Sequence, residues 1–309
     1  AGTTEAMTYT GRFAPSPTGP LHFGSLVAAL GSFLQARSRG GRWLVRMEDI
    51  DPPREMAGAA DLILEALEAF DLHWDGPVVY QSGRDAAYEE ALHRLLATGR
   101  GFRCTCSRRD AAEAAAARGL PGHVYPGTCR TAHHREAGRH AIRALAEGPE
   151  VVFADTLQGR QRQHVEGEVG DFVVRRADGL YAYQLAVVVD DAEQGITEVV
   201  RGADLLDVTP RQIHLQRLLE LPTPAYLHLP VAVNVKGQKL SKQTFARPLD
   251  PADPVPALRD ALAFLGQAPP PELGDATVEE LLQWAVAHWD AGRVPPGPIP
   301  VPDGVPSNR

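Results

Sequence analysis

The N-terminal part of the chain predicts a strand, a turn, a helix and a second strand in close succession. Thr8–Phe13 has the composition of a short strand, whereas Ala14–Gly19 contains two prolines and a glycine and cannot belong to a regular element. Apolar residues recur at helical spacing from Leu21 to about Arg37, and Arg42–Glu48 predicts the second strand. Two strands joined through a helix are typical of a parallel pair. This order therefore restricts the fold to an α/β architecture with a parallel sheet.

The same criteria predict further elements along the rest of the chain. Helices are expected at Ala59–Phe70, after Ser82 as an N-cap, from Thr209-Pro210, at Pro256–Leu265 and at Val278–Trp289. Strands are expected at Phe172–Arg175, Tyr183–Val189, Ile196–Val200 and His228–Val235. Periodicity is weak between Cys104 and about Gly170, which indicates an insertion into the α/β domain. The Pro/Gly-rich tail from Gly292 is expected to be disordered.

Composition excludes several classes of protein. With 44% hydrophobic and 23% charged residues, the 309-residue chain matches an ordinary globular protein rather than a disordered one. The longest apolar run, around Leu185–Val189, is far too short to span a membrane, and no signal-peptide pattern is recognisable. Three cysteines argue against a disulfide framework, so we expect a cytoplasmic protein. We also expect a monomer.

Positive charge is concentrated in the middle of an acidic chain. The net charge is −8, but Arg100–Arg176 holds 13 arginines against nine acidic residues, so this segment is +4 and the remainder −12. A basic region of this kind is consistent with a local contact to nucleic acid. A solvated arginine-rich surface explains the charge equally well.

The three lysines of the chain all fall within residues 236–242, whereas 28 arginines are spread over the rest. Lys236, Lys239 and Lys242 follow a predicted strand, together with Ser241. Flexible ammonium groups can follow the charge that develops on a transferring phosphoryl group. The alternative, a basic surface loop, is weakened because the chain uses arginine for its other cations.

A second candidate phosphate site lies where the first predicted helix begins. His22 and Gly24 stand at the end of the proline-rich turn. Free N–H groups at a helix N-terminus attract phosphate, a histidine there can bond phosphate oxygens, and a glycine permits close approach of a nucleotide. The alternative is a proline-rich turn with a surface histidine.

These two segments carry a resemblance to a known family. Pro15-Ser-Pro-Thr-Gly-x-Leu-His-x-Gly24, followed about 220 residues later by Lys239-Leu-Ser-Lys242, resembles the two signature motifs of class I aminoacyl-tRNA synthetases. Gly11–Pro17 and Arg46–Arg54 narrow the resemblance to the glutamyl branch, and Val187–Asp191 and Ile196–Asp204 look like that branch too. The similarity covers roughly Gly11–Ala246.

The resemblance implies a class I synthetase fold: a Rossmann-type parallel sheet with a zinc-bearing insertion and a short C-terminal helical region. The corresponding domains are the first half of the catalytic domain (7–100), the insertion (101–170), the second half (171–235), the lysine loop with the C-terminal helices (236–291) and the tail (292–309).

The resemblance also implies which residues act on which ligand. ATP, with Mg²⁺, would be bound by His22, Gly24, Lys239, Ser241 and Lys242, of which His22 and Lys242 would be catalytic. L-Glutamate would be bound by Arg12, Phe13, Ala14, Pro15, Ser16, Glu48, Tyr183 and Arg201. Arginine suits carboxylates because it donates two parallel hydrogen bonds, and Glu48 suits the substrate ammonium. For Arg12 and Glu48, a salt bridge at the strand ends is the alternative.

The chain departs from a full glutamyl-tRNA synthetase after the lysine motif. Only 66 residues follow Gln243, which is too few for a typical anticodon-reading domain. The shortened pattern resembles the glutamyl-Q tRNA(Asp) synthetases, which activate glutamate with ATP and transfer it to queuosine, the modified wobble base of tRNA(Asp). The expected partner is therefore the tRNA(Asp) anticodon stem-loop carrying queuosine, and no membrane is expected to take part. Three alternatives stay open: a truncated synthetase charging a tRNA 3′ end, a small-molecule adenylyltransferase and a non-catalytic RNA-binding paralogue.

Cysteines in the predicted insertion suggest a structural zinc site. Cys104 and Cys106 lie in one turn and Cys129 is a distant third, so a tetrahedral site would lack one ligand. Chemistry alone favours a histidine as the fourth ligand, with candidates His123, His133 and His134. The family resemblance instead places Tyr125 there, through the pattern Cys-x-Cys…Tyr-x-x-x-Cys. The alternative is three free buried thiols.

Overall fold

The computed structural model describes residues 7–238 and 249–301, and a parallel sheet lies at its centre. Strands β1 (Thr10–Phe13), β2 (Arg42–Met47) and β3 (Val79–Tyr80) pair in that order, all parallel. Strand β9 (Glu198–Gly202) pairs in parallel with β10 (Ala225–Leu229). The backbone N–H of Thr197 donates to the carbonyl of Thr10 at 2.9 Å and links the two groups of strands. The predicted parallel α/β fold is confirmed.

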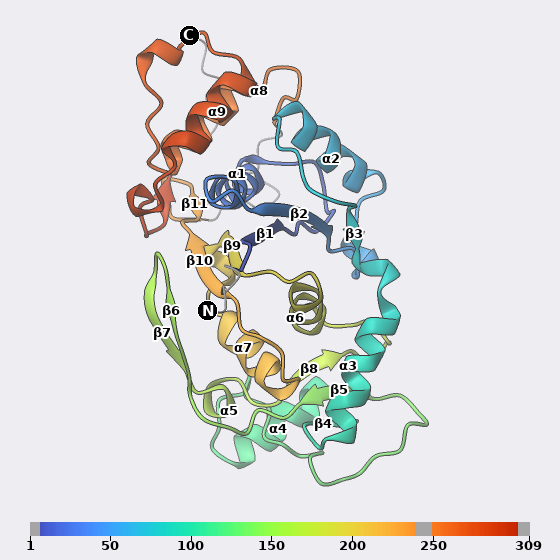
Figure 1. Cartoon of the computed structure of the whole chain (residues 1–309). Helices are drawn as coiled ribbons and strands as arrows, with labels where there is room; N and C mark the ends of the chain where they lie inside the picture. The colour runs from blue at the N-terminus through green and yellow to red at the C-terminus, as the bar shows by residue number, and fades with distance from the viewer. Residues whose placement is uncertain (1–6, 239–248, 302–309) are drawn as a thin grey trace, which may run out of the picture.

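Helices cover both faces of this sheet. Figure 1 shows α1 (Phe23–Arg37) and α2 (Ala59–Ala69) on one side of β1 and β2, and α6 (Tyr183–Glu193) on the other. Helices α3 (Asp85–Ala97) and α7 (Thr209–Leu218) pack beside α6. Two apolar cores follow from this arrangement: one contains Leu30, Trp43 and Leu229, and the other contains Tyr88 and Leu185.

Much of the segment with weak periodicity lies at one end of the molecule, where its sheet shares an apolar core with α3 and α6 (Figure 1). Strands β4 (Gly101–Cys104), β5 (Ala141–Ala144) and β8 (Phe172–Arg175) form an antiparallel sheet, with α4 (Arg108–Ala117) and α5 (Val165–Glu168) nearby. The hairpin of β6 (Val151–Asp155) and β7 (Gly159–Gln163) instead reaches the central sheet, where β6 pairs with β10. The chain therefore leaves and re-enters the central sheet within this segment.

At the opposite end of the molecule, α8 (Pro254–Phe264) and α9 (Val278–His288) pack against α1 (Figure 1). The indole N–H of Trp289 donates to the side-chain oxygen of Gln35 in α1 at 2.7 Å. Among the described residues, no helix has the length and apolar character that a membrane crossing requires.

Several predicted elements were wrong. Tyr183–Val189 is the start of helix α6 and not a strand, because a short apolar run buried on most sides has the same composition in either element. Ser82 does not cap α3: its N–H and hydroxyl both donate to the Asp49 carboxylate, and the helix begins at Asp85. Pro230 lies between β10 and the short β11 (Ala232–Val233), so the predicted strand His228–Val235 is interrupted.

The beginning of the C-terminal tail is ordered, contrary to the prediction of disorder from Gly292. Val294 is buried, and β12 (Ile299–Pro300) pairs in parallel with β11. Two backbone hydrogen bonds, from Ile299 to Val231 and from Val301 to Val233, hold the tail against the end of β10. The apolar residues between the prolines are therefore ordered because they pack against the rest of the protein.

Candidate functional site

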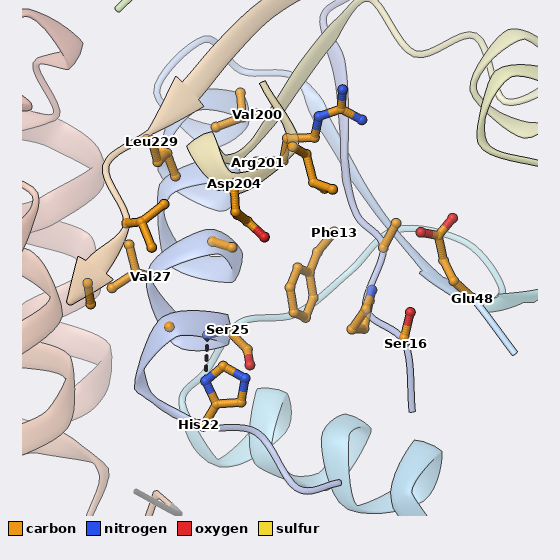
Figure 2. Close-up of a pocket in the computed structure, with 18 of the residues that line it drawn as sticks. Phe13, Ser16, His22, Ser25, Val27, Glu48, Val200, Arg201, Asp204 and Leu229 are labelled. Atoms are coloured by element: carbon orange, nitrogen blue, oxygen red, sulfur yellow. Dashed lines mark hydrogen bonds between the residues drawn. The ribbon is translucent and has the colours of Figure 1, made fainter. Parts of the chain in front are cut away.

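A cavity of about 330 Å³ lies at the carboxyl ends of the parallel strands, where ligands of open α/β sheets bind (Figure 2). The turn after β1 and the start of α1 form one wall, the end of β2 and the start of α6 another, and the ends of β9 and β10 the third. The sequence-predicted residues in its lining are Arg12, Phe13, Ala14, Pro15, Ser16, His22, Gly24, Glu48, Tyr183 and Arg201. The fold thus gathers all eight residues predicted for glutamate, and two of the five predicted for ATP, around one cavity.

His22 and Gly24 occupy the N-terminus of α1. His22 is the N-cap, and its Nδ1 accepts a hydrogen bond from the Ser25 backbone N–H at 3.3 Å (Figure 2). A Cβ on Gly24 would lie 3.2 Å from the His22 ring, so the glycine keeps this end of the helix open. The remaining predicted ATP residues, Lys239, Ser241 and Lys242, lie outside the described residues.

Arg12 is held in place by a buried carboxylate. Its Nε and Nη2 donate to the two oxygens of Asp191 at 3.0 and 3.2 Å, and Asp191 also accepts from Arg46 Nη2 at 2.6 Å. Burial would raise the pKa of Asp191, but the charges of Arg12 and Arg46 outweigh it and hold the pKa at about 2. Arg12 at the end of β1 thus forms a salt bridge, with Asp191 of helix α6 as its partner, and this contact orients Arg12 at the cavity wall.

Glu48 directly follows β2 at the cavity wall, and its carboxylate is largely desolvated. Gln81 Nε2 donates to Glu48 Oε2 at 2.8 Å, and Arg46 Nη1 lies 3.8 Å from the same oxygen. Burial is the largest influence and raises the pKa of Glu48 to about 7, although the charges of Arg46 and Arg12 oppose it. A cationic group of a substrate would stabilise the ionised form of this carboxylate, because it would replace the hydration lost on burial.

Sequence reasoning did not assign several lining residues to the site: Gly202, Asp204, Leu205, Leu229, Pro230, Val231 and Ala232. Asp204 belongs to a segment that already resembled the glutamyl branch, so the motif contained the signal. The residues after β10 had no comparable signal, because their role depends on the position of Pro230 at the strand end.

The cysteines of the insertion form a compact cluster. The sulfurs of Cys104, Cys106 and Cys129 lie within 4.8 Å of one another, and those of Cys106 and Cys129 are 3.6 Å apart. The Tyr125 hydroxyl lies 3.4 Å from Cys104 Sγ and 3.8 Å from Cys106 Sγ. Tetrahedral zinc with Zn–S bonds of about 2.3 Å holds its sulfurs roughly 3.8 Å apart, so these four groups fit a zinc site.

Among the described residues, His134 is the candidate histidine that contacts a sulfur of this cluster. His134 Nε2 lies 3.3 Å from Cys129 Sγ, whereas His123 Nε2 faces the Glu168 carbonyl at 3.1 Å. Burial raises the pKa of the Cys129 thiol, but hydrogen bonds from the Thr105 backbone and from His134 lower it to about 6. The Tyr125 hydroxyl thus lies close to two of the three sulfurs, and His134 Nε2 lies close to the third.

A groove of about 490 Å³ borders the cysteine cluster, and its charge is mainly positive. We call it the basic groove; its charged lining residues are Arg108, Arg139, Arg143, Arg176 and Asp178, with His140 between them. Among the described residues, neither Arg108 nor Arg139 has an acidic partner, whereas Arg176 pairs with Asp178 at 2.7 Å. Four of the thirteen arginines counted in Arg100–Arg176 therefore line one groove.

Comparisons with known proteins identify the family of this chain. Residues 9–251 match the family described as tRNA synthetases class I (E and Q), catalytic domain. The chain is 55% identical to a glutamyl-Q tRNA(Asp) synthetase of Chromobacterium violaceum over 95% of this chain and 98% of that protein. It is 56% identical to one of Aromatoleum aromaticum, over 94% and 91% of the two chains.

A solved structure shows the same fold. The glutamate-tRNA synthetase of Elizabethkingia anophelis superposes with a TM-score of 0.78 at 25% identity, over 96% of this chain and 68% of that one. The class I synthetase fold expected from the motifs is thereby confirmed. The chain is a ligase of the class I aminoacyl-tRNA synthetases and belongs to the family of the glutamyl-Q tRNA(Asp) synthetases.

Proposed function

We propose that this enzyme activates L-glutamate with ATP and transfers it to queuosine at the wobble position of tRNA(Asp). The observation that carries the proposal is the joint lining of one cavity by two arginines, one buried carboxylate and the N-terminus of α1. Glutamate has two carboxylates and one ammonium. Arg201 and Arg12 would bind the carboxylates, Arg12 through Nη1 because its Nε and Nη2 already bond to Asp191, and Glu48 would bind the ammonium. The proposed tRNA substrate is taken from the names of relatives, which are more than 50% identical to this chain over almost their whole length.

In the proposed first step, an oxygen of the glutamate α-carboxylate attacks the α-phosphorus of ATP. The bond to the bridging oxygen breaks, pyrophosphate leaves, and glutamyl-adenylate remains. His22, at the helix N-terminus, and Lys242 would stabilise the added negative charge, together with Lys239, Ser241 and the close approach that Gly24 permits. Mg²⁺ bound with ATP supplies charge neutralisation on the phosphates.

In the proposed second step, a hydroxyl of the queuosine ring attacks the activated carbonyl carbon. The hydroxyl loses its proton, an ester bond forms and AMP leaves. Neither step needs a covalent enzyme intermediate, so the residues around the cavity serve to bind, orient and stabilise charge.

The basic groove supports an RNA partner. Its arginines can contact the sugar–phosphate backbone of the tRNA(Asp) anticodon stem-loop, a contact that depends on charge and not on sequence. Arg176 Nη1 lies 4.0 Å from a carboxylate oxygen of Asp51, in the segment after the cavity-lining Glu48. We propose that phosphates next to the reacting nucleotide contact the groove.

The cysteine cluster supports a structural zinc ion, held by Cys104, Cys106, Cys129 and Tyr125. Its role would be to stabilise the insertion, whose three-stranded sheet and short helices offer a small core of their own. We also propose that the enzyme acts as a monomer in the cytoplasm, where the three thiols would remain reduced.

The decisive experiment is transfer of labelled glutamate to purified tRNA(Asp) with and without queuosine. We expect label only on the queuosine-containing tRNA. Equal label on both would refute the modification activity and favour charging of the 3′ end. Substitution of Lys242 by Ala should reduce glutamate-dependent ATP–pyrophosphate exchange by orders of magnitude.

A further inference from the structure

A line of three buried polar side chains runs from the β6–β7 hairpin to the cavity. Asp155 ends β6, His228 lies in β10 and Arg201 lies in β9, and these side chains are 3%, 0% and 5% exposed, respectively. His228 Nδ1 lies 2.5 Å from Asp155 Oδ2, and Arg201 Nε lies 3.0 Å from His228 Nε2. Figure 1 shows the strands that carry them side by side.

The chemistry of arginine determines the protonation of the histidine. A guanidinium group has N–H donors and no acceptor, so His228 Nε2 must accept the hydrogen bond from Arg201 Nε. The ring is then neutral and carries its proton on Nδ1, which donates to Asp155. Burial lowers the pKa of His228, which favours the same neutral form.

Asp155 is itself held by the backbone. It accepts N–H groups from His228 at 3.1 Å, from Leu157 at 3.0 Å and from Gln158 at 2.9 Å. Burial raises the pKa of Asp155, but the hydrogen bond from His228 and these backbone donors lower it below its ordinary value. Asp155 is therefore a fixed acceptor that selects one tautomer of His228.

The opposite side of Arg201 is also constrained. Its Nη2 donates to the Thr209 hydroxyl at 2.9 Å, and that hydroxyl donates to the Leu205 carbonyl at 2.9 Å. Its Nη1 lies 3.5 Å from the Tyr183 hydroxyl at the cavity wall. The bonds at Nε and Nη2 thus set the plane of the guanidinium and leave Nη1 beside the hydroxyl of Tyr183, a residue of the cavity lining.

We propose that Asp155 and His228 are positioning residues for glutamate binding: they fix the guanidinium of Arg201 in the orientation that receives a substrate carboxylate. This inference rests on the proposed function, because it takes Arg201 to be a glutamate-binding residue. It also assigns a purpose to the β6–β7 hairpin, which reaches the central sheet at the pair Asp155 and Tyr226.

The test measures L-glutamate binding to the full chain by calorimetry, so it does not depend on transfer to tRNA. His228→Leu removes the acceptor at similar size, His228→Gln restores an acceptor oxygen near Nε2, and Asp155→Asn permits the wrong tautomer. We expect His228→Leu and Asp155→Asn to weaken glutamate binding by roughly ten- to hundredfold, as for a lost hydrogen bond to a charged group. His228→Gln should recover most of this loss, and the KM for ATP in pyrophosphate exchange should change by less than about twofold.

Nitrogen-15 NMR of the wild-type ring provides a readout that needs no variant. We expect Nε2 to show the shift of an unprotonated nitrogen and Nδ1 that of a protonated one, and Asp155→Asn to alter this pattern. A protonated Nε2 in the wild type overturns the proposal, as do folded Leu and Asn variants that bind glutamate normally. Equal loss for glutamate and ATP, or a Gln variant as weak as Leu, indicates a merely structural role and also overturns it. If the variants weaken glutamate binding as expected but the enzyme does not transfer glutamate to queuosine, the positioning role stands and only the proposed function fails.

Discussion

The raised pKa of Glu48 predicts that glutamate binding weakens as the pH falls through neutrality. Burial shifts the pKa of this carboxyl to about 7, so the residue is mostly ionised at pH 8 and mostly neutral at pH 6. Only the ionised form pairs with the substrate ammonium. With a pKa near 7, the ionised fraction falls from about ten-elevenths at pH 8 to about one-eleventh at pH 6, so the KM for glutamate should rise about tenfold.

The assay is glutamate-dependent ATP–pyrophosphate exchange between pH 6 and 8. The ammonium and carboxylates of free glutamate do not titrate in this range, whereas ATP does, so the KM for ATP is measured at each pH as a control. Glu48→Gln keeps the shape of the side chain without the charge; it should raise the KM at pH 8 and make it nearly independent of pH. A KM that is flat in the wild type, or that rises with the same slope in the Gln variant, would refute this reasoning.

Three further predictions concern the rest of the molecule. Asp191→Asn removes the counter-charge of two buried arginines and should lower the free energy of unfolding in urea by about 3–5 kcal/mol. The control is Glu113→Gln, which breaks an exposed ion pair and should leave the free energy of unfolding unchanged within error. Combined substitution of Arg108 and Arg139 by Ala should weaken tRNA binding and reduce the slope of log affinity against log salt by roughly 0.7–0.9 per lost phosphate contact. Arg109 follows Arg108 in α4 but lies outside the groove lining, so Arg109→Ala should leave that slope unchanged. If Arg109→Ala reduced the slope as much as the double substitution, the groove would not be the tRNA-binding surface. Purified protein should contain about one zinc ion per chain, and chelation should lower its melting temperature; a metal-free protein of unchanged stability would contradict the zinc site.

Much of the fold could be predicted because its first elements have clear local patterns. The turn at Ala14–Gly19 has prolines and a glycine where neither helix nor strand can continue, and α1 and α2 show helical periodicity. Tyr183–Val189 was predicted wrongly because this apolar run has only seven residues, which fit a strand or a helix equally well. Helix α1 is also buried on most sides, but its apolar residues keep helical spacing over 15 residues.

The sequence by itself indicated which kinds of chemistry to expect: arginines suited to carboxylates, a helix start suited to phosphate, a lysine loop and three cysteines suited to zinc. Only the tertiary structure decided which buried groups are partners. Arg12 bonds to Asp191 across 179 residues, and Asp155 bonds to His228 across 73. Such pairs have no spacing rule, because strand order and helix packing bring them together. Desolvation then makes each of these contacts strong enough to orient a side chain at the cavity.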